Sequence, residues 1–167
     1  MIRSTLCYIE KDGKYLMLFR NKKFHDPCEG KWVGIGGKFE PGETQDECLL
    51  REVWEETGLK LTAFHFHGIV HFQSDRLEDE DMYLYTASSF DGNDPASGGS
   101  RFDCNEGDLC WIPKADVLSL NLWEGDPLFL RKLIAGEETL EMTCRYEGDR
   151  LVSWSDDLSP QEAGKDT

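Results

Sequence analysis

Alternating apolar and polar side chains mark the strands in the first half of the chain. Residues 2–10 and 14–21 follow strand patterns, and the Lys11-Asp12-Gly13 run between them is a hairpin turn signal. Residues 62–73 and 81–88 show strand patterns as well, separated by an acidic segment. This half of the chain therefore predicts four strands.

A glycine-rich loop and a sharply delimited helix lie between these strand regions. The glycines within residues 34–37 allow unusual φ values and a close approach of the backbone to a ligand. Thr44 and Glu47 have the spacing of a capping box, and Gly58 suits the position just past a helix end. The pattern therefore predicts a helix between Thr44 and Gly58.

The second half of the chain predicts shorter elements after a turn-rich, mobile loop at residues 91–107. A strand is predicted at residues 109–112 and one helical turn from Pro113. A helix with an N-cap and N1 pattern is predicted from Asp126-Pro127 to near Gly136, and a hairpin pairs residues 139–146 with 150–154. Together they predict a single α/β domain over residues 1–154, with a mixed sheet packed between helices, and a disordered tail at residues 155–167.

The charge balance limits the partners of this domain. The chain has 167 residues, and its 33 acids against 18 bases give a formal net charge of −15. Such a surface repels nucleic-acid polymers, although metal ions can still neutralise a small phosphate ligand. The six cysteines are widely spaced, and neither a signal-peptide core nor a membrane-length apolar run is present. We therefore expect reduced thiols, a cytoplasmic location and no membrane partner.

The predicted helix carries apolar and acidic residues on neighbouring arcs. Its apolar arc consists of Leu49, Leu50, Val53 and Trp54, and its acidic arc of Glu52, Glu55 and Glu56. Carboxylates at this spacing can converge on one or two Mg²⁺ ions, and Mn²⁺ is also possible. A solvated glutamate-rich surface is the alternative. Arg51 is expected to point away from the three acids and to pair with Glu43.

The full spacing from Gly37 through Glu43, Arg51-Glu52 and Glu55-Glu56 to Gly58 matches the signature of the Nudix hydrolases, so the chain resembles that family. The resemblance implies a mixed sheet between helices and metal-dependent hydrolysis of a nucleoside diphosphate linked to another moiety.

The same resemblance assigns roles to individual residues. Glu52, Glu55 and Glu56 become metal ligands together with the Gly37 carbonyl, and Arg51 and Glu43 become a structural ion pair. The general base is left open between Glu55 and Glu106.

Residues outside the signature are similar to the MutT-type branch of the family. These are residues 31–38, the Cys104-Asn105-Glu106-Gly107 and Cys110-Trp111-Ile112-Pro113 runs, and residues 121–126. That branch hydrolyses oxidised purine nucleoside triphosphates such as 8-oxo-dGTP to the monophosphate and pyrophosphate. The resemblance therefore implies a small nucleotide as the partner of a monomer or homodimer.

The branch resemblance also suggests which residues contact substrate. Glu106 is then a further metal ligand or base, or else a solvated loop acid. Trp123 stacks on the purine or belongs to the core, and Asp126 binds a guanine edge or caps the last helix, with capping favoured. Further candidates for the substrate pocket are Lys22, Lys23, Gly36, Gly37, Lys38 and Phe72; the alternative is a solvated surface position for each lysine and a core position for Phe72.

Two departures from the human-type member of the branch affect its base selectivity. Val33 stands where that enzyme has an asparagine, and Gly125-Asp126 stands where it has two aspartates. Because those polar groups read the base there, selectivity for 8-oxoguanine does not carry over directly.

Two other functions stay open. One is Nudix hydrolysis of ADP-ribose, a dinucleotide or a capped RNA. Family members specific for ADP-ribose resemble one another in having a proline some way after the signature, and residues 60–85 contain none, so ADP-ribose is disfavoured. The other is a non-catalytic nucleotide-sensing module.

Three histidines on one predicted strand form a further pattern. His65, His67 and His71 share strand parity, which places them on one face as a zinc site or, more commonly, as a polar strand surface.

Overall fold

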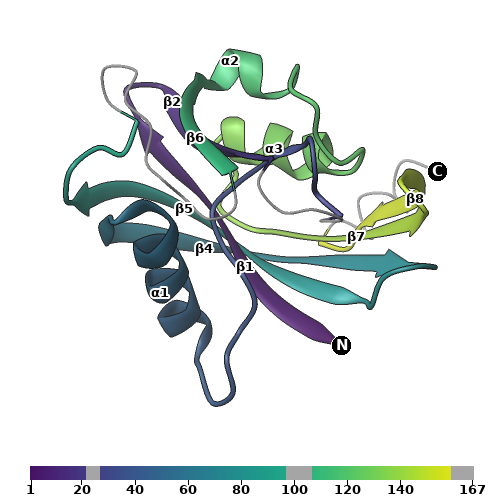
Figure 1. Ribbon diagram of the computed structural model, residues 1–167. Coiled ribbons are helices and arrows are strands. Elements are labelled where there is room, and N and C mark those ends of the chain that lie inside the picture. Colours follow the sequence, from purple (N-terminus) through teal and green to yellow (C-terminus); the bar gives the residue numbers. More distant parts are fainter. Residues whose placement is uncertain (22–26, 97–106, 159–167) are drawn as a thin grey trace.

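The computed structural model describes residues 1–21, 27–96 and 107–158. Its strands form one mixed sheet in the order β3-β2-β1-β5-β4-β7-β8, with β6 paired to β2 (Figure 1). The strands are β1 (Ile2–Lys11), β2 (Lys14–Arg20), β3 (Trp32–Val33), β4 (Lys60–Ser74), β5 (Glu80–Asp91), β6 (Gly107–Pro113), β7 (Leu140–Glu147) and β8 (Arg150–Asp156). The helices are α1 (Gln45–Thr57), α2 (Lys114–Val117) and α3 (Asp126–Ile134).

Helices cover both faces of this sheet. Helix α1 lies against one face, and α2 and α3 lie against the other (Figure 1). Leu49 and Val53 of α1 join a buried cluster with β1, β2 and β5, whereas Phe129 and Leu130 of α3 join a second cluster on the opposite face. The predicted α/β architecture of a mixed sheet between helices is therefore confirmed.

Two local predictions are confirmed by the backbone. Asp12 and Gly13 both have positive φ, at 53° and 74°, as a tight hairpin turn of the primed type requires. Thr44 and Glu47 make the reciprocal hydrogen bonds of the capping box, and Gly58 ends α1 in the left-handed conformation. These features are readable from sequence because each depends on only a few consecutive residues.

The predicted mobile loop and tail fall largely outside the described residues. Asp91 belongs to β5 and Gly107 to β6, so the ends of the predicted loop are strand. Strand β8 extends to Asp156, past the predicted domain end at residue 154. The cysteines within the described ranges are free thiols, namely Cys7, Cys28, Cys48, Cys110 and Cys144.

The prediction that three histidines share one face of β4 is wrong. In the pairing of β4 with β5, His65 lies opposite Thr86 and His71 lies opposite Asp81. Directly paired residues share a face, and Thr86 and Asp81 are an odd number of positions apart, so His65 and His71 point to opposite faces. The cause is a β-bulge between Phe66 and Gly68, which adds one residue to β4.

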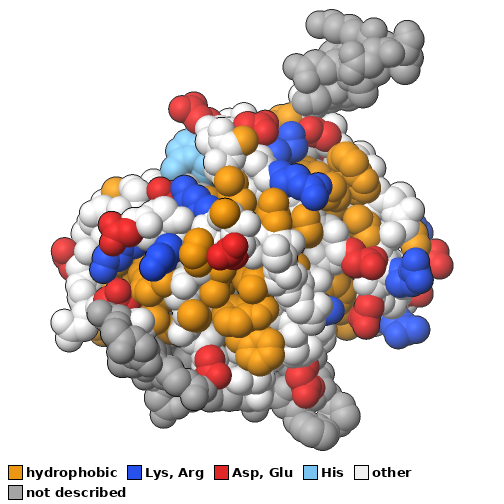
Figure 2. Space-filling model, turned by 90° about the horizontal axis from the view of Figure 1, so that it is seen from above, with side chains coloured by type: hydrophobic (Ala, Val, Ile, Leu, Met, Phe, Trp, Pro, Cys, Tyr) orange, Lys and Arg blue, Asp and Glu red, His pale blue; other side chains and the backbone are white. Residues whose placement is uncertain are grey.

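The surface mixes apolar and charged side chains. Seen from the side of α2 and α3, hydrophobic side chains gather in the middle of the face, with acidic and basic groups among and around them (Figure 2). Among the described residues, no helix combines the length and the apolar character needed to cross a membrane.

Gly68 is predicted to be required at the bulge. Its φ is 147°, and a Cβ there would lie 1.6 Å from the Leu140 carbonyl oxygen of the neighbouring strand. Gly68→Ala should lower the free energy of unfolding by about 3 kcal/mol or more, measured by urea denaturation. Gly13→Ala is the matched control, because Gly13 has a positive φ but open space around it, and should cost roughly 1–2 kcal/mol. Equal losses in the two variants would contradict the assigned backbone clash.

Candidate active site

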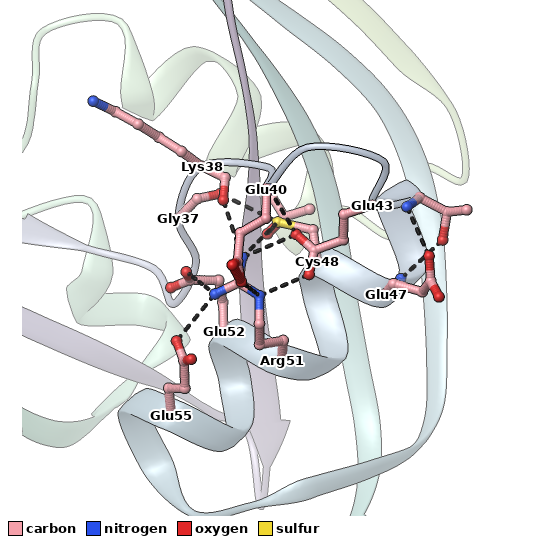
Figure 3. Close-up of polar contacts among 11 residues, drawn as sticks. Gly37, Lys38, Glu40, Glu43, Glu47, Cys48, Arg51, Glu52 and Glu55 are labelled. Carbon is pink, nitrogen blue, oxygen red and sulfur yellow. Dashed lines mark hydrogen bonds and ion pairs between the residues drawn. The ribbon is translucent and has the colours of Figure 1, made fainter.

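Arg51 ties the glycine loop to α1. Its Nε lies 2.7 Å from Glu43 Oε2 and its Nη2 lies 2.9 Å from Glu43 Oε1, so the two side chains form a two-pronged ion pair. Nη2 also donates to the Lys38 carbonyl at 3.1 Å (Figure 3). The hydrogen bonds that Arg51 donates to Glu43 lower the pKa of the Glu43 carboxyl to about 2. The predicted pairing of Arg51 with Glu43 is confirmed.

The expectation that Arg51 points away from the acids of α1 is wrong. Its Nη1 lies 2.7 Å from Glu52 Oε1 and 3.0 Å from Glu55 Oε2 (Figure 3). A long arginine side chain reaches both carboxylates while its other nitrogens hold Glu43, because the guanidinium presents five N–H donors in one plane. Arg51 therefore offsets part of the repulsion among the carboxylates of this helix.

Glu56 joins the loop to the helix at a buried position. Its side chain is 5% exposed, and Oε2 accepts a hydrogen bond of 2.9 Å from the Gly36 N–H. A Cβ on Gly36 would lie 1.8 Å from the Thr5 carbonyl oxygen, so only glycine allows the loop to run this close to β1. The glycine thereby places a backbone donor directly against Glu56.

The two consecutive glycine carbonyls face different neighbours. The Gly37 carbonyl accepts from the Thr5 N–H at 2.9 Å and contacts Cys48 Sγ at 3.4 Å. The N–H and C=O of one residue in an extended chain point to the same edge, and the Gly36 N–H points toward Glu56. We therefore expect the Gly36 carbonyl to face the acids of α1.

Gly37 has a different part in the site. A Cβ there would lie 2.4 Å from Glu52 Oε2, so the missing side chain leaves room for the Glu52 carboxylate.

The oxygen atoms on this part of α1 fit a hard divalent cation. Three carboxylates, from Glu52, Glu55 and Glu56, project from successive turns beside the glycine loop, and Mg²⁺ and Mn²⁺ prefer such oxygen donors. Glu106, the other predicted ligand, lies outside the described residues, as do Lys22 and Lys23.

A cleft of about 810 Å³ connects this cluster with the opposite sheet face. Gly36, Gly37, Lys38 and Glu52 line one end, and the ammonium group of Lys38 projects away from Arg51 and the acids (Figure 3). Apolar side chains line the middle, including Leu6, Val33, Val70 and Met82. The other end is lined by Cys28, Phe72, Trp123, Asp126, Cys144 and Tyr146.

The far end of the cleft is aromatic. The Phe72 and Trp123 ring centroids lie 5.7 Å apart in an edge-to-face arrangement, and each ring also packs on Tyr146. The Lys31 ammonium lies 5.5 Å from the Trp123 ring centroid. Trp123 is only 9% exposed yet lines the cleft, so it belongs to the core and to the cleft wall at once.

Asp126 faces this aromatic end, and the prediction that it caps α3 is wrong. The N-cap position is Gly125, and no side chain makes a capping hydrogen bond there. Helix α3 begins one residue earlier than expected, and the N–H of its N-cap residue Gly125 donates to Tyr146 Oη at 2.7 Å. Burial raises the pKa of Asp126 to about 7, and the positive charge of Lys31 only partly opposes this shift.

Tyr146 also explains one departure from the human-type pattern. A Cβ at Gly125 would lie 2.8 Å from Tyr146 Oη and 3.1 Å from Cys144 Sγ, so a second aspartate does not fit beside Asp126. The sequence patterns gave no sign that Tyr146, Cys28 and Cys144 line the cleft. Tyr146 had a strand pattern typical of burial, but no local signal links β7 to Trp123.

Comparison with known proteins assigns the family. The NUDIX domain model matches residues 2–133. The Nudix hydrolase YvcI of Bacillus subtilis is 30% identical over 164 residues, which cover 95% of each chain. The oxidized purine nucleoside triphosphate hydrolase of Mus musculus is 33% identical over 133 residues, covering 77% of this chain and 79% of the mouse protein.

A solved structure agrees with the family match. The crystal structure of a MutT protein from Bacillus halodurans has a TM-score of 0.82 and 27% identity, covering 96% of this chain and all of that one. The chain belongs to the Nudix family, and it is a Nudix hydrolase of the MutT type.

The ion pair of Glu43 should make stability depend on pH at the acidic end. Its pKa lies below the ordinary value of 4.5, so the pair stabilises the fold above that pH and loses this contribution as pH falls toward about 2. Glu43→Gln should therefore lower the free energy of unfolding at pH 6 by about 1 kcal/mol, with the difference from wild type shrinking between pH 4.5 and 2. Urea denaturation across this range measures the difference, and a pH-independent gap would contradict the assignment.

Asp126 should show the opposite dependence on pH. Its pKa lies above the ordinary value of 3.8, so the folded state holds the proton more tightly and stability falls as pH rises from about 4 to about 7. Asp126→Asn, an uncharged isostere, should raise the free energy of unfolding by on the order of 2 kcal/mol at pH 8 and leave it unchanged near pH 3. A variant that is no more stable at pH 8 than wild type would show that burial does not disfavour this carboxylate.

Proposed function

We propose that this protein is a Mg²⁺- or Mn²⁺-dependent hydrolase of nucleoside triphosphates, with oxidised purine nucleotides as the favoured class, releasing the nucleoside monophosphate and pyrophosphate. The observation that carries this proposal is the single cleft with two chemically different ends. Its Glu52 end suits a metal-bound polyphosphate, and its Trp123 and Asp126 end suits a base. A cytoplasmic location, where free nucleotides occur, belongs to the same proposal.

At the phosphate end, Glu52, Glu55 and Glu56 would hold the cation. A bound divalent cation neutralises the phosphate oxygens and lowers the pKa of a water molecule. The Gly36 N–H fixes the Glu56 carboxylate, and Arg51 holds Glu52 and Glu55 toward one another. The backbone ligand predicted at Gly37 is better supplied by Gly36, because the Gly37 carbonyl is already bound to β1.

The general base would be an acid that can reach a water molecule. Glu55 has a side chain that is 55% exposed, so it has the freedom to accept a proton. Glu106 stays a second prediction for this role and for metal binding. The proposal therefore assigns proton transfer to Glu55 or Glu106, while Glu52 and Glu56 are the more enclosed of the metal ligands.

At the base end, Asp126 would select the ring through hydrogen bonds. A carboxyl group with a pKa of about 7 can donate as well as accept near neutral pH, which suits a purine edge that carries both kinds of group. Phe72 and Trp123 supply the aromatic wall against which a base packs. The similarity to the mouse oxidized purine nucleoside triphosphate hydrolase supports this class of substrate.

Glu56→Gln should reduce turnover about 100-fold or more, because it removes one negative ligand while keeping the size of the side chain. The measurement is Mg²⁺-dependent release of pyrophosphate from 8-oxo-dGTP, dGTP, dATP and dCTP, with ADP-ribose and a dinucleoside polyphosphate as further substrates.

Glu47→Gln is the matched control for this variant. It makes the same chemical change on the same helix, and glutamine retains the capping-box acceptor at the N-terminus of α1. Control activity should equal that of the wild type.

A higher kcat/KM for 8-oxo-dGTP than for dGTP supports the proposed substrate class. Turnover in Glu56→Gln equal to the wild type would contradict the assigned metal site, and binding of nucleotides with no hydrolysis of any would favour a sensing module.

A further inference from the structure

A second group of metal-ligating side chains lies on the sheet face opposite the cleft. His71 of β4 lies against Glu141 of β7 and close to Asp157, which follows β8. The neighbours of His71 on the strand, Val70 and Phe72, line the cleft, so alternation along the strand directs His71 to the other face. The group lies toward the β8 edge of the sheet, whereas the acids of α1 lie beside the glycine loop that pairs with β1, so it is separate from the acids proposed to bind the substrate cation.

The hydrogen bonds of His71 call for a positive charge between its ring and the acids. Nδ1 lies 2.7 Å from Asp81 Oδ1, and Nε2 lies 3.0 Å from Glu141 Oε2. Ionised carboxylates only accept hydrogen bonds, and a neutral imidazole has one N–H to donate. One ring nitrogen can therefore be satisfied by its own proton, and the other needs either a second proton or a cation shared with the carboxylate.

The surrounding contacts have the form of a supported metal site. Asp81 holds the Nδ1–H of His71, which leaves Nε2 to act as a ligand, as in the carboxylate–histidine–metal arrangement. Thr143 Oγ1 and Ser155 Oγ donate to the two oxygens of Asp157, at 2.7 Å and 2.6 Å. Each of these two candidate ligands is thus oriented by a partner of its own.

The distances allow one ion to reach all three ligands. One potential ligand atom from each of His71, Glu141 and Asp157 lies within 4.8 Å of the others. Ligand atoms around a tetrahedral zinc ion lie about 3.3 Å apart, and His71 Nε2 and Glu141 Oε2 are already closer than that. Asp157 is at least partly exposed and follows the end of β8, so its side chain has room to approach the other two ligands.

We propose that His71, Glu141 and Asp157 form a second metal site, for a first-row transition cation such as Zn²⁺, with Asp81 orienting the histidine ring. The nitrogen ligand distinguishes this site from the all-oxygen cluster on α1. The Asp157 N–H also donates to the Glu141 carbonyl at 2.8 Å, so the ion would fasten the segment after β8 to the sheet. This inference does not rest on the proposed substrate.

Zn²⁺ binding to the whole protein tests this site, with excess Mg²⁺ present to occupy the carboxylates of α1. Isothermal titration should show that His71→Gln and Asp157→Asn each lose one equivalent of Zn²⁺ or bind it at least tenfold more weakly. The ¹⁵N resonance of His71 Nε2 in the wild type should shift as Zn²⁺ is added. Mg²⁺-dependent hydrolysis by both variants should match the wild type.

His65→Gln is the matched control, because His65 lies on the same strand but points to the other face. The centroids of the His65 and His67 rings lie 4.6 Å apart. The Zn²⁺ stoichiometry of this variant at the His71 site should be unchanged. An unmoved His71 Nε2 resonance in the wild type would overturn the proposal, whether or not a variant folds. It would leave His71 as an imidazolium held by Asp81 and Glu141. Equal Zn²⁺ binding by the wild type and the folded His71→Gln variant would overturn it as well.

Discussion

Repulsion among like charges on one helix is the constraint around which this structure is arranged. Glu52, Glu55 and Glu56 project from two turns of α1, and such a group is costly to hold together without positive charge or hydrogen-bond donors among its members. Arg51 bridges two of them, and the Gly36 N–H binds the third. The glycines, the Arg51–Glu43 pair and the capping box all serve to keep the loop against this helix.

Electrostatic repulsion also acts along the cleft. A chain with a net charge of −15 repels a free polyphosphate, and the proposed function therefore places cations at the carboxylate end. At the other end, burial raises the pKa of Asp126 to about 7, which lowers the average negative charge of the base pocket near neutral pH. Phe72, Trp123 and Tyr146 give that end of the cleft an aromatic wall. These features are consistent with the proposed binding of an anionic nucleotide by an acidic protein.

Local chemistry made much of this architecture predictable from sequence, and long-range contacts limited the rest. The hairpin at Asp12-Gly13 and the limits of α1 each depend on a few neighbouring residues, so both were predicted correctly. The bulge before Gly68 depends on β7, and it reversed the expected face of His71. Asp126 lines the cleft beside Tyr146 of β7 instead of capping α3, and no pattern near Asp126 in the sequence indicates this long-range contact.

The most direct test of the central claim is a Mg²⁺ titration followed by backbone amide NMR. The Gly36 N–H is bound to Glu56 Oε2, so cation binding by the acids of α1 must change its environment. The account predicts saturable shifts that are largest at Gly36 and at the amides of Glu52 to Glu56, and that are lost in Glu56→Gln. Shifts confined to other parts of the chain, or none at Gly36, would contradict it.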